Sequence, residues 1–343
     1  MKKYLLSVLA MLLVAGGLFA YNWLRDNRMS NFNESFELYV RPETCSDDVL
    51  QMVAGTVMNA RRLKKVFREK EVDTYLKPGH YLVRASCSSV ELARRLNNGW
   101  QTPVRLTLSG ALRKKTEIAG KIGAQMLVDS AAVLAALQDP VFLRPFGYTP
   151  ETVFSMFVPD TYEMYWTATL EEIFQRQKKA SDAYWTPARV EQARQVGLSR
   201  EEACILASIV RGESRYEPEL PKIAGVYLNR LAIGMKLQAD PTIAFCYDYE
   251  PHRILRAHLG HPSAYNTYQN KGLPPGPICV PAPAYIEAVL HPDYGTDSGK
   301  AGRNGNLYFC ANSDFSGSHV FAKTYTEHQK NARKFQKALN NRK

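Results

Sequence analysis

The chain has 343 residues, of which 45% are hydrophobic and 22% charged, and its formal net charge is +11 at pH 7. This composition is that of an ordinary globular protein of about two domains, and it excludes a disordered, fibrous or low-complexity chain. The positive charge either solvates helix faces or favours an anionic partner such as anionic lipid or a carboxylate-rich polymer; because no nucleic-acid-binding motif accompanies it, we expect no nucleic acid partner.

An apolar run without a charged residue begins after Met1-Lys2-Lys3 and extends to about residue 24. About 20 such residues span a bilayer. Leu18-Phe19-Ala20 is a poor cleavage site for a signal peptidase, and Tyr21 and Trp23 are typical of membrane interfaces. An uncleaved anchor is therefore favoured over a signal peptide. The predicted segments are a short tail at 1–3, a transmembrane helix at 4–24 and a polar linker at 25–35. Lys2 and Lys3 on one side and Arg25 and Arg28 on the other leave the orientation of the helix open.

Two stretches that follow the linker have the same pattern, ELYVRPETCSDDVLQMV and HYLVRASCSSVELARRL. Each is a short β-rich run, then Ser, Thr or Asp as candidate helix caps, then an amphipathic helix. The duplication predicts a small α+β module over residues 36–101. Cys45 and Cys87 occupy equivalent positions in the two copies, so a disulfide bridge and two separate buried thiols both remain open.

Residues 102–198 are mixed and are predicted to form a supporting α+β region. VRLTLSG alternates like a strand that ends at Gly110, and KKTEIAGKIG and SAAVLAALQ have helical patterns. FSMFVPDTY is interpreted as an aromatic strand and turn. Thr169 and Glu172 form a capping box that predicts the start of the next helix.

The strongest chemical signal lies at the start of a predicted catalytic region, residues 199–343. Ser199 and Glu202 form another capping box, and Ile205, Ile209 and Glu213 follow at helical spacing. This places one carboxyl group at the end of an apolar stripe, where loss of water raises its pKa and makes it a proton donor near neutral pH. Spacing alone also fits a surface acid, and Gly212 is a candidate helix end one residue earlier.

No metal site or cofactor is expected. His258 and His261 lack the H-E-x-x-H spacing of a metalloprotease, and the six cysteines show no C-x-x-C pair.

Four long segments carry a resemblance to a known family: LASIVRGES, IAGVYLNRLAIGMKLQADPTIAF, SAYNTYQNKGLPPGPICVPAPAYIEAVLHP and LYFCANSDFSGSHVFAKTYTEH. In this order they resemble the endolytic murein transglycosylases of the YceG-like family, and the likeness extends upstream through FVPDTYEMYW and the duplicated module. The resemblance implies an α+β chain with an N-terminal transmembrane helix, a small LysM-like module that holds glycan strands, and a larger mixed α/β catalytic domain. The family's essential glutamate falls on Glu213.

The resemblance also implies the location and the reaction. The body would lie in the periplasm on a single-pass inner-membrane anchor, with the tail at 1–3 in the cytoplasm. It would cleave the bond between N-acetylmuramate and N-acetylglucosamine in peptidoglycan and leave 1,6-anhydro ends, with a role in terminating nascent strands and with partners in the wall-synthesis machinery. One departure is Arg211, where the family usually has an acid; its guanidinium is expected to lower the pKa of Glu213.

Polar residues in turn-rich segments are the candidate substrate contacts. They are Gln238, Asp240, Tyr265, Asn266 and Tyr268. For each of them a structural role in a turn or core is the alternative. Two other functions remain open: a hydrolytic muramidase that pairs Asp240 with Glu213, and a catalytically silent peptidoglycan-binding scaffold.

Overall fold

The computed structural model describes residues 2–341 and divides into two compact units. Met1 of the predicted tail and the last two residues of the predicted catalytic region lie outside the described residues. Unit 1 comprises Met1–Leu106, Gln125–Val128 and Tyr162–Ala168, and unit 2 comprises Thr107–Ala124, Asp129–Thr161 and Thr169–Lys343. The division passes through strands β3 (Val104–Leu108) and β4 (Asp160–Met164), which pair in one small sheet. The predicted mixture of helices and strands is confirmed.

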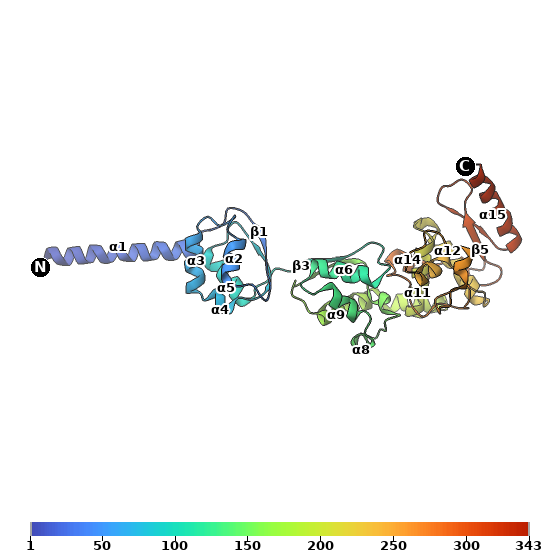
Figure 1. Ribbon diagram of the computed structural model, residues 1–343, viewed down its shortest axis with the longest axis horizontal. Coiled ribbons are helices and arrows are strands. Elements are labelled where there is room, and N and C mark those ends of the chain that lie inside the picture. Colours follow the sequence, from blue (N-terminus) through green and yellow to red (C-terminus); the bar gives the residue numbers. More distant parts are fainter. Residues whose placement is uncertain (1, 342–343) are drawn as a thin grey trace. The chain divides into compact units, whose positions relative to one another are not determined.

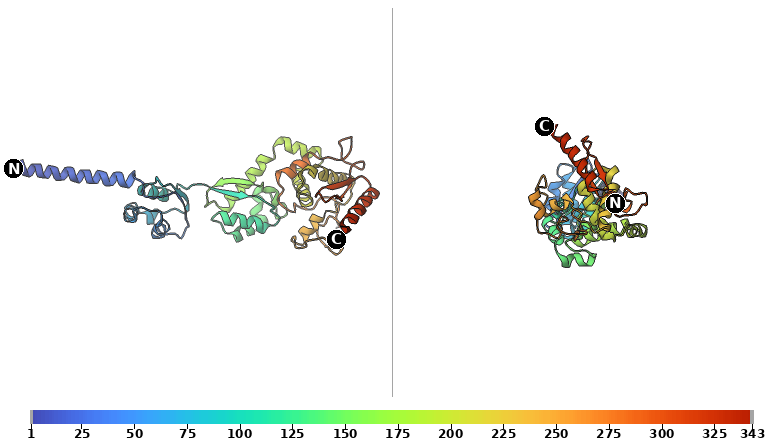
Figure 2. Two further views of the ribbon diagram at one scale, coloured as in Figure 1. Left: turned by 90° about the horizontal axis from the view of Figure 1, so that it is seen from above. Right: turned by 90° about the vertical axis from the view of Figure 1, so that its right-hand side faces the viewer.

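Helix α1 (Lys2–Asn27) carries the apolar run, and within it Leu6–Asn27 is long and apolar enough to cross a membrane. The apolar 18-residue window of this stretch is not buried against the rest of the chain. Figures 1 and 2 show α1 as a single straight helix that leads into the first folded module. Membrane anchors and signal sequences share these features, and both place apolar side chains where the protein itself gives them no cover.

The end of α1 is bonded to the module that follows it. The Asp26 carboxylate is buried and lies 3.1 Å from the Arg62 Nε atom, and Arg62 also donates to the backbone carbonyl of Met29 at 2.8 Å. The Ser88 hydroxyl donates to the carbonyl of Asn27 at 3.0 Å. The residues predicted as a polar linker therefore include the acidic member of a buried ion pair that joins α1 to the module.

The module contains a two-stranded antiparallel sheet in which Leu38 lies opposite Tyr81. Its elements are β1 (Phe36–Val40), α2 (Ser46–Met52), α3 (Ala60–Glu69), α4 (Val72–Tyr75), β2 (Gly79–Val83) and α5 (Ser89–Asn98). The predicted strand-helix repeats correspond to β1 with α2 and to β2 with α5. Cys45 and Ser88 are the N-caps, Cys45 is exposed and Cys87 is buried, and the two thiols are free. Neither the bridge nor the pair of buried thiols is present.

Unit 2 is mostly helical. Its elements before the candidate site are α6 (Lys115–Gln125), α7 (Ser130–Ala136), α8 (Pro140–Leu143), the 3₁₀ turns η1 (Arg144–Phe146) and η2 (Val153–Met156), α9 (Leu170–Tyr184) and α10 (Pro187–Gln195). The helices predicted in KKTEIAGKIG and SAAVLAALQ are confirmed as α6 and α7, and the Thr169–Glu172 capping box is present. The strand predicted in FSMFVPDTY begins only at Asp160, because the preceding aromatic residues form η2 and pack into the core.

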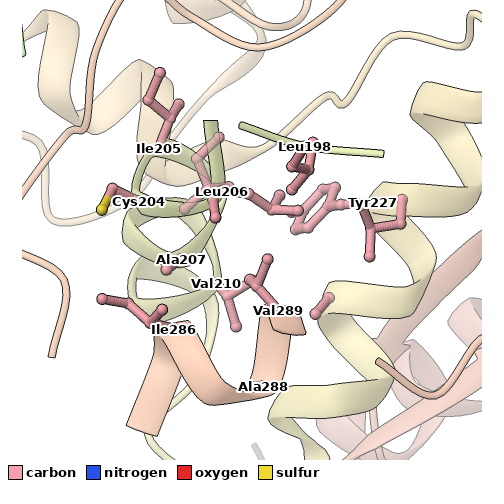
Figure 3. Close-up of a cluster of buried hydrophobic side chains, with 14 of the residues drawn as sticks. Leu198, Cys204, Ile205, Leu206, Ala207, Val210, Tyr227, Ile286, Ala288 and Val289 are labelled. Atoms are coloured by element: carbon pink, nitrogen blue, oxygen red, sulfur yellow. The ribbon is translucent and has the colours of Figure 1, made fainter. Parts of the chain in front are cut away.

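The core of unit 2 surrounds α11 (Arg200–Glu213), which packs against α12 (Leu220–Ala232), α13 (Asp240–Cys246) and α14 (Pro283–Leu290). Figure 3 shows its apolar side chains interleaved with those of α12 and α14. The remaining elements are η3 (Glu217–Glu219), η4 (Arg256–Gly260), β5 (Tyr308–Ala311), β6 (His319–Ala322) and α15 (Tyr325–Asn340). Strands β5 and β6 form an antiparallel hairpin.

Long loops are attached to this helical core by buried polar groups. The fully buried Ser208 hydroxyl on α11 accepts from the Ile278 N–H at 3.0 Å and donates to the Ile205 carbonyl at 2.7 Å. The Asn229 amide on α12 donates to the carbonyls of Tyr294 and Asn306. These bonds satisfy backbone groups that would otherwise be buried without partners, and they hold the loops against the core.

Candidate active site

Glu213 is the last residue of α11. The predicted capping box is present at the start of this helix, where Ser199 accepts from the Glu202 N–H, and Ile205 and Ile209 are buried along the predicted stripe. Because the helix extends to Glu213, the carboxyl group of this residue lies at the edge of the apolar core. The side chain is only partly accessible to solvent.

The Glu213 carboxyl group is hydrogen-bonded by one tyrosine. The Tyr227 hydroxyl, from the fully buried ring on α12, donates to Glu213 Oε1 at 2.5 Å. Burial, the largest cause, and the neighbouring charge of Asp240 raise the pKa of Glu213 to about 7, although the Tyr227 hydrogen bond and the charge of Arg230 oppose them. With Oε1 accepting from tyrosine, a neutral carboxyl group would carry its proton on Oε2, which is the arrangement of a general acid.

Asp240 forms the second acidic position. It is exposed at the first turn of α13, and its Oδ1 accepts from the Tyr268 hydroxyl at 2.6 Å. Burial, this hydrogen bond, and then the charges of Asp240 and Glu213 raise the pKa of the Tyr268 phenol, so it remains a donor at neutral pH. Asp240 and Tyr268 therefore belong to the same electrostatic environment as Glu213.

Arg230 adds a buried positive charge to this environment. It lies one helical turn after Tyr227 on α12 and donates from Nε to the Leu307 carbonyl at 2.7 Å and from Nη1 to the Leu237 carbonyl. Its guanidinium lies 5.6 Å from the centre of the Tyr308 ring. Burial lowers the pKa of Arg230, while the neighbouring phenols and Glu213 raise it. These hydrogen bonds hold the Arg230 guanidinium near the Glu213 carboxyl group, which is not itself one of their acceptors.

Gly212 allows α11 and α13 to approach each other closely. A Cβ atom built at this position would lie 2.3 Å from Pro241 Cβ, a separation that real side chains do not adopt. Pro241 directly follows Asp240. The glycine therefore does not end the helix before Glu213, as the sequence allowed; it lets the two acidic positions come from helices in contact.

Arg211 faces away from Glu213, so the expectation that it would lower the pKa of Glu213 is wrong. Its guanidinium donates to the carbonyls of Val280 and Gly110 at 2.5 Å each and lies over the Tyr285 ring. Residues two apart on an α-helix project to opposite faces. The departure from the usual family pattern thus stabilises a loop and leaves the carboxyl group unaffected.

The other predicted contacts separate into different roles. Asn266 is fully buried: its amide donates to the Leu259 and His261 carbonyls, and its carbonyl accepts from the Tyr268 N–H. It has no surface left for a substrate, so its predicted substrate contact is replaced by a structural role.

Tyr265 and Gln238, the other two residues of the predicted set, have contacts outside the group formed by Glu213, Asp240 and Tyr268. Tyr265 packs against Phe245, with ring centres 4.6 Å apart, and burial raises its pKa to about 12. Gln238 is exposed, adopts a left-handed φ of 51° and donates from its backbone to the Thr267 carbonyl. The part of the chain that the structure describes contains no group of three or more His, Cys, Asp or Glu placed to hold a metal ion.

Comparisons with known proteins address the chain as a whole. The YceG-like family model matches residues 38–334. The chain belongs to the YceG-like family. A crystal structure of a YceG-like protein from Listeria monocytogenes is similar, with a TM-score of 0.55 and 26% identity, and covers 87% of this chain and 98% of that one.

Two curated relatives of the YceG-like chain have the name endolytic murein transglycosylase. The one from Bacillus subtilis is 32% identical over 235 residues, which cover 64% of this chain and 62% of the relative. The one from Streptococcus pneumoniae serotype 2 is 25% identical over 367 aligned positions, which cover 96% of this chain and 64% of the relative. The YceG-like chain therefore spans less than two thirds of the length of these relatives.

Three residues that contribute to the site escaped the sequence analysis: Tyr227, Arg230 and Tyr308. The first two lie inside the quoted segment IAGVYLNRLAIG, where Asn229 and Arg230 interrupt an apolar helix. Polar side chains in such a buried run need hydrogen-bond partners. Their presence in the apolar helix is the sequence feature that points to these residues. His319 is bonded to Glu219 at 3.0 Å and packs edge-on against Phe309, so it has a structural role.

We expect the Glu213 carboxyl group of this YceG-like chain to titrate near pH 7, as its pKa of about 7 requires. Tyr227→Phe removes a donor that favours the carboxylate and should raise this pKa, whereas Asp240→Asn removes a repelling charge and should lower it. Carbon-13 NMR of labelled glutamate side chains, assigned by the loss of one signal in Glu213→Gln, measures both shifts.

Tyr325→Phe is the matched control for Tyr227→Phe, because Tyr325 is 58% exposed on α15. It should leave the titration unchanged. A Glu213 signal that titrates near the ordinary value of 4.5 in the unaltered chain would contradict this electrostatic description.

Gly212→Ala should separate α11 from α13 and lower the free energy of unfolding by about 1–3 kcal/mol, the usual cost of an added atom in a packed interior. Gly120→Ala on α6 is its control, since a Cβ there meets nothing within 4 Å and alanine favours the helix. Thermal unfolding of both variants provides the comparison. Equal stabilities for the two would show that Pro241 yields without strain.

Proposed function

We propose that this chain is an endolytic lytic transglycosylase that cleaves peptidoglycan between N-acetylmuramate and N-acetylglucosamine, with Glu213 as acid and then base. One observation carries the proposal: the pKa of Glu213 is raised to about 7, on a partly buried carboxyl group whose second oxygen has no hydrogen-bond partner among the described residues. Membership of the YceG-like family and the names of its relatives support the same reaction.

The proposed chemistry needs one acid. Glu213, protonated on Oε2, donates its proton to the glycosidic oxygen as the bond to muramate C1 breaks. The 6-hydroxyl of the same muramate then bonds to C1, and the Glu213 carboxylate accepts the proton of that hydroxyl. The products are a free 4-hydroxyl on N-acetylglucosamine and a 1,6-anhydromuramyl end, with no water consumed. The nucleophile belongs to the substrate, so its position is already favourable.

The two alternatives receive less support. In a muramidase, Asp240 would activate water or attack the sugar, but its Oδ1 accepts from Tyr268 and its charge serves to raise the pKa of Glu213. A silent scaffold would be favoured if Arg211 disturbed Glu213, but the Arg211 guanidinium bonds to two backbone carbonyls elsewhere. Asp240, Tyr268 and the exposed Gln238 are proposed to contact the sugar substituents, and Tyr265 to support them.

We also propose that the module over residues 36–101 is LysM-like and holds glycan strands. It has a pocket of about 620 Å³ whose lining includes the basic residues Arg61, Lys64, Lys65 and Arg68 together with acidic, polar and apolar residues. Such a lining suits the hydroxyl, amide and carboxylate groups of peptidoglycan. Helix α1 is proposed as an uncleaved inner-membrane anchor that places the body in the periplasm. Partners in the wall-synthesis machinery and strand termination remain predictions.

Product analysis of purified murein tests the reaction. Glu213→Gln should lower the release of anhydro-ended fragments by about 10²-fold or more, because an amide cannot supply the proton. Unaltered chain should lose activity as the pH rises through about 7, when the acid ionises.

Asp240→Asn separates the two catalytic alternatives. A transglycosylase should still form only anhydro products, at a rate that falls at neutral pH because the pKa of Glu213 is lowered, whereas a muramidase would lose activity as fully as in Glu213→Gln. Release of reducing ends by the unaltered chain, or an undiminished rate for Glu213→Gln, would refute the proposal.

A further inference from the structure

A pocket of about 310 Å³ lies in unit 1 where α1 meets the module. Its lining consists of Trp23, Asn27, Arg28, Glu91, Arg94 and Trp100. The two indole rings are 50% and 58% exposed, and both arginines are exposed. Neither Arg28 nor Arg94 forms an ion pair within residues 2–341. Two aromatic rings and two unpaired guanidinium groups thus converge on one opening.

The position of this pocket along α1 matches the edge of a bilayer. The helix from Leu6 to Leu24 extends about 28 Å at a rise of about 1.5 Å per residue, close to the roughly 30 Å of a hydrocarbon core. Trp23 lies in the last turn of this stretch, and Asn27 and Arg28 follow within the next turn, at the depth of the head groups. Tryptophan favours this layer, and arginine there reaches phosphate.

The pocket is held at that depth by bonds between α1 and the module. The buried ion pair between Asp26 and Arg62 and the Ser88 hydrogen bond to the Asn27 carbonyl lie beside the pocket. Arg94 and Trp100 therefore cannot leave the end of α1 independently. When α1 crosses a membrane, these two residues of the module are brought to the same surface as Trp23.

We propose that this pocket binds the phosphate of a membrane phospholipid and so seats the module on the outer surface of the membrane. Two guanidinium groups and the Glu91 carboxylate leave one net positive charge in the lining, which matches the single negative charge of a phosphodiester. Guanidinium groups bind phosphate oxygens through paired donors, and the indole rings cover the acyl and glycerol atoms beside them. The proposal rests on the proposed membrane anchor and does not involve Glu213.

The test uses the full chain in nanodiscs of phosphatidylethanolamine and phosphatidylglycerol, with a phospholipid spin-labelled on its head group as quencher. The chain has four tryptophans, and Trp166 and Trp185 are each only 6% exposed. In Trp23→Phe, Trp100 remains as the exposed tryptophan, and its emission is obtained by difference from the Trp23→Phe/Trp100→Phe chain. We expect strong quenching of Trp100, reduced about two-fold or more when Arg28→Gln and Arg94→Gln are added.

Arg61→Gln with Arg68→Gln is the matched control, because it removes the same charge from another pocket of the module. It should leave the quenching of Trp100 unchanged. Unquenched Trp100 in a chain that remains in the discs would overturn the lipid site while leaving the anchor intact. Recovery of the chain outside the discs would overturn both, and equal losses in the two arginine pairs would show only a general attraction of charge.

Discussion

The hydrogen bond from the buried Tyr227 to Glu213 Oε1 is the contact around which the candidate site is built. It joins the end of α11 to the middle of α12 and settles which carboxyl oxygen is free. This hydrogen bond also moderates the pKa of Glu213. Burial and the charge of Asp240 alone would raise that pKa further, and the tyrosine, together with the charge of Arg230, lowers it to about 7. A carboxyl group with this pKa exists in both protonation states at neutral pH, as a residue that gives and then accepts a proton must.

The packing of unit 2 can be understood as support for this contact. Gly212 permits α13 to lie against α11, which places the charge of Asp240 close enough to act on Glu213. Ser208 and Arg211 hold the loop at residues 278–280 against α11 from its other faces. Arg230 fixes two further loops through their carbonyls. Ser208, Arg211 and Arg230 bond to backbone groups, so within residues 2–341 Tyr227 is the hydrogen-bond partner of Glu213.

Local patterns were predictable from the sequence, whereas contacts between distant segments were not. The capping boxes at Ser199 and Thr169 involve residues three apart, so their helices begin where the sequence indicates. The direction of the Arg211 side chain depends on carbonyls far along the chain, and its proximity in sequence to Glu213 was misleading. Asn266 was chosen as a polar residue in a turn, yet that turn encloses it completely. The Tyr227 contact needs the packing of two helices before it can be seen.

The central claim is that one carboxyl group suffices because the sugar supplies its own nucleophile. Digestion of purified murein in water enriched in oxygen-18, followed by mass spectrometry of the new muramyl ends, tests it most directly. The account predicts anhydro ends without the heavy isotope, since no water enters the reaction. Reducing ends that contain oxygen-18 would contradict it, because they would require a water molecule activated by a second group.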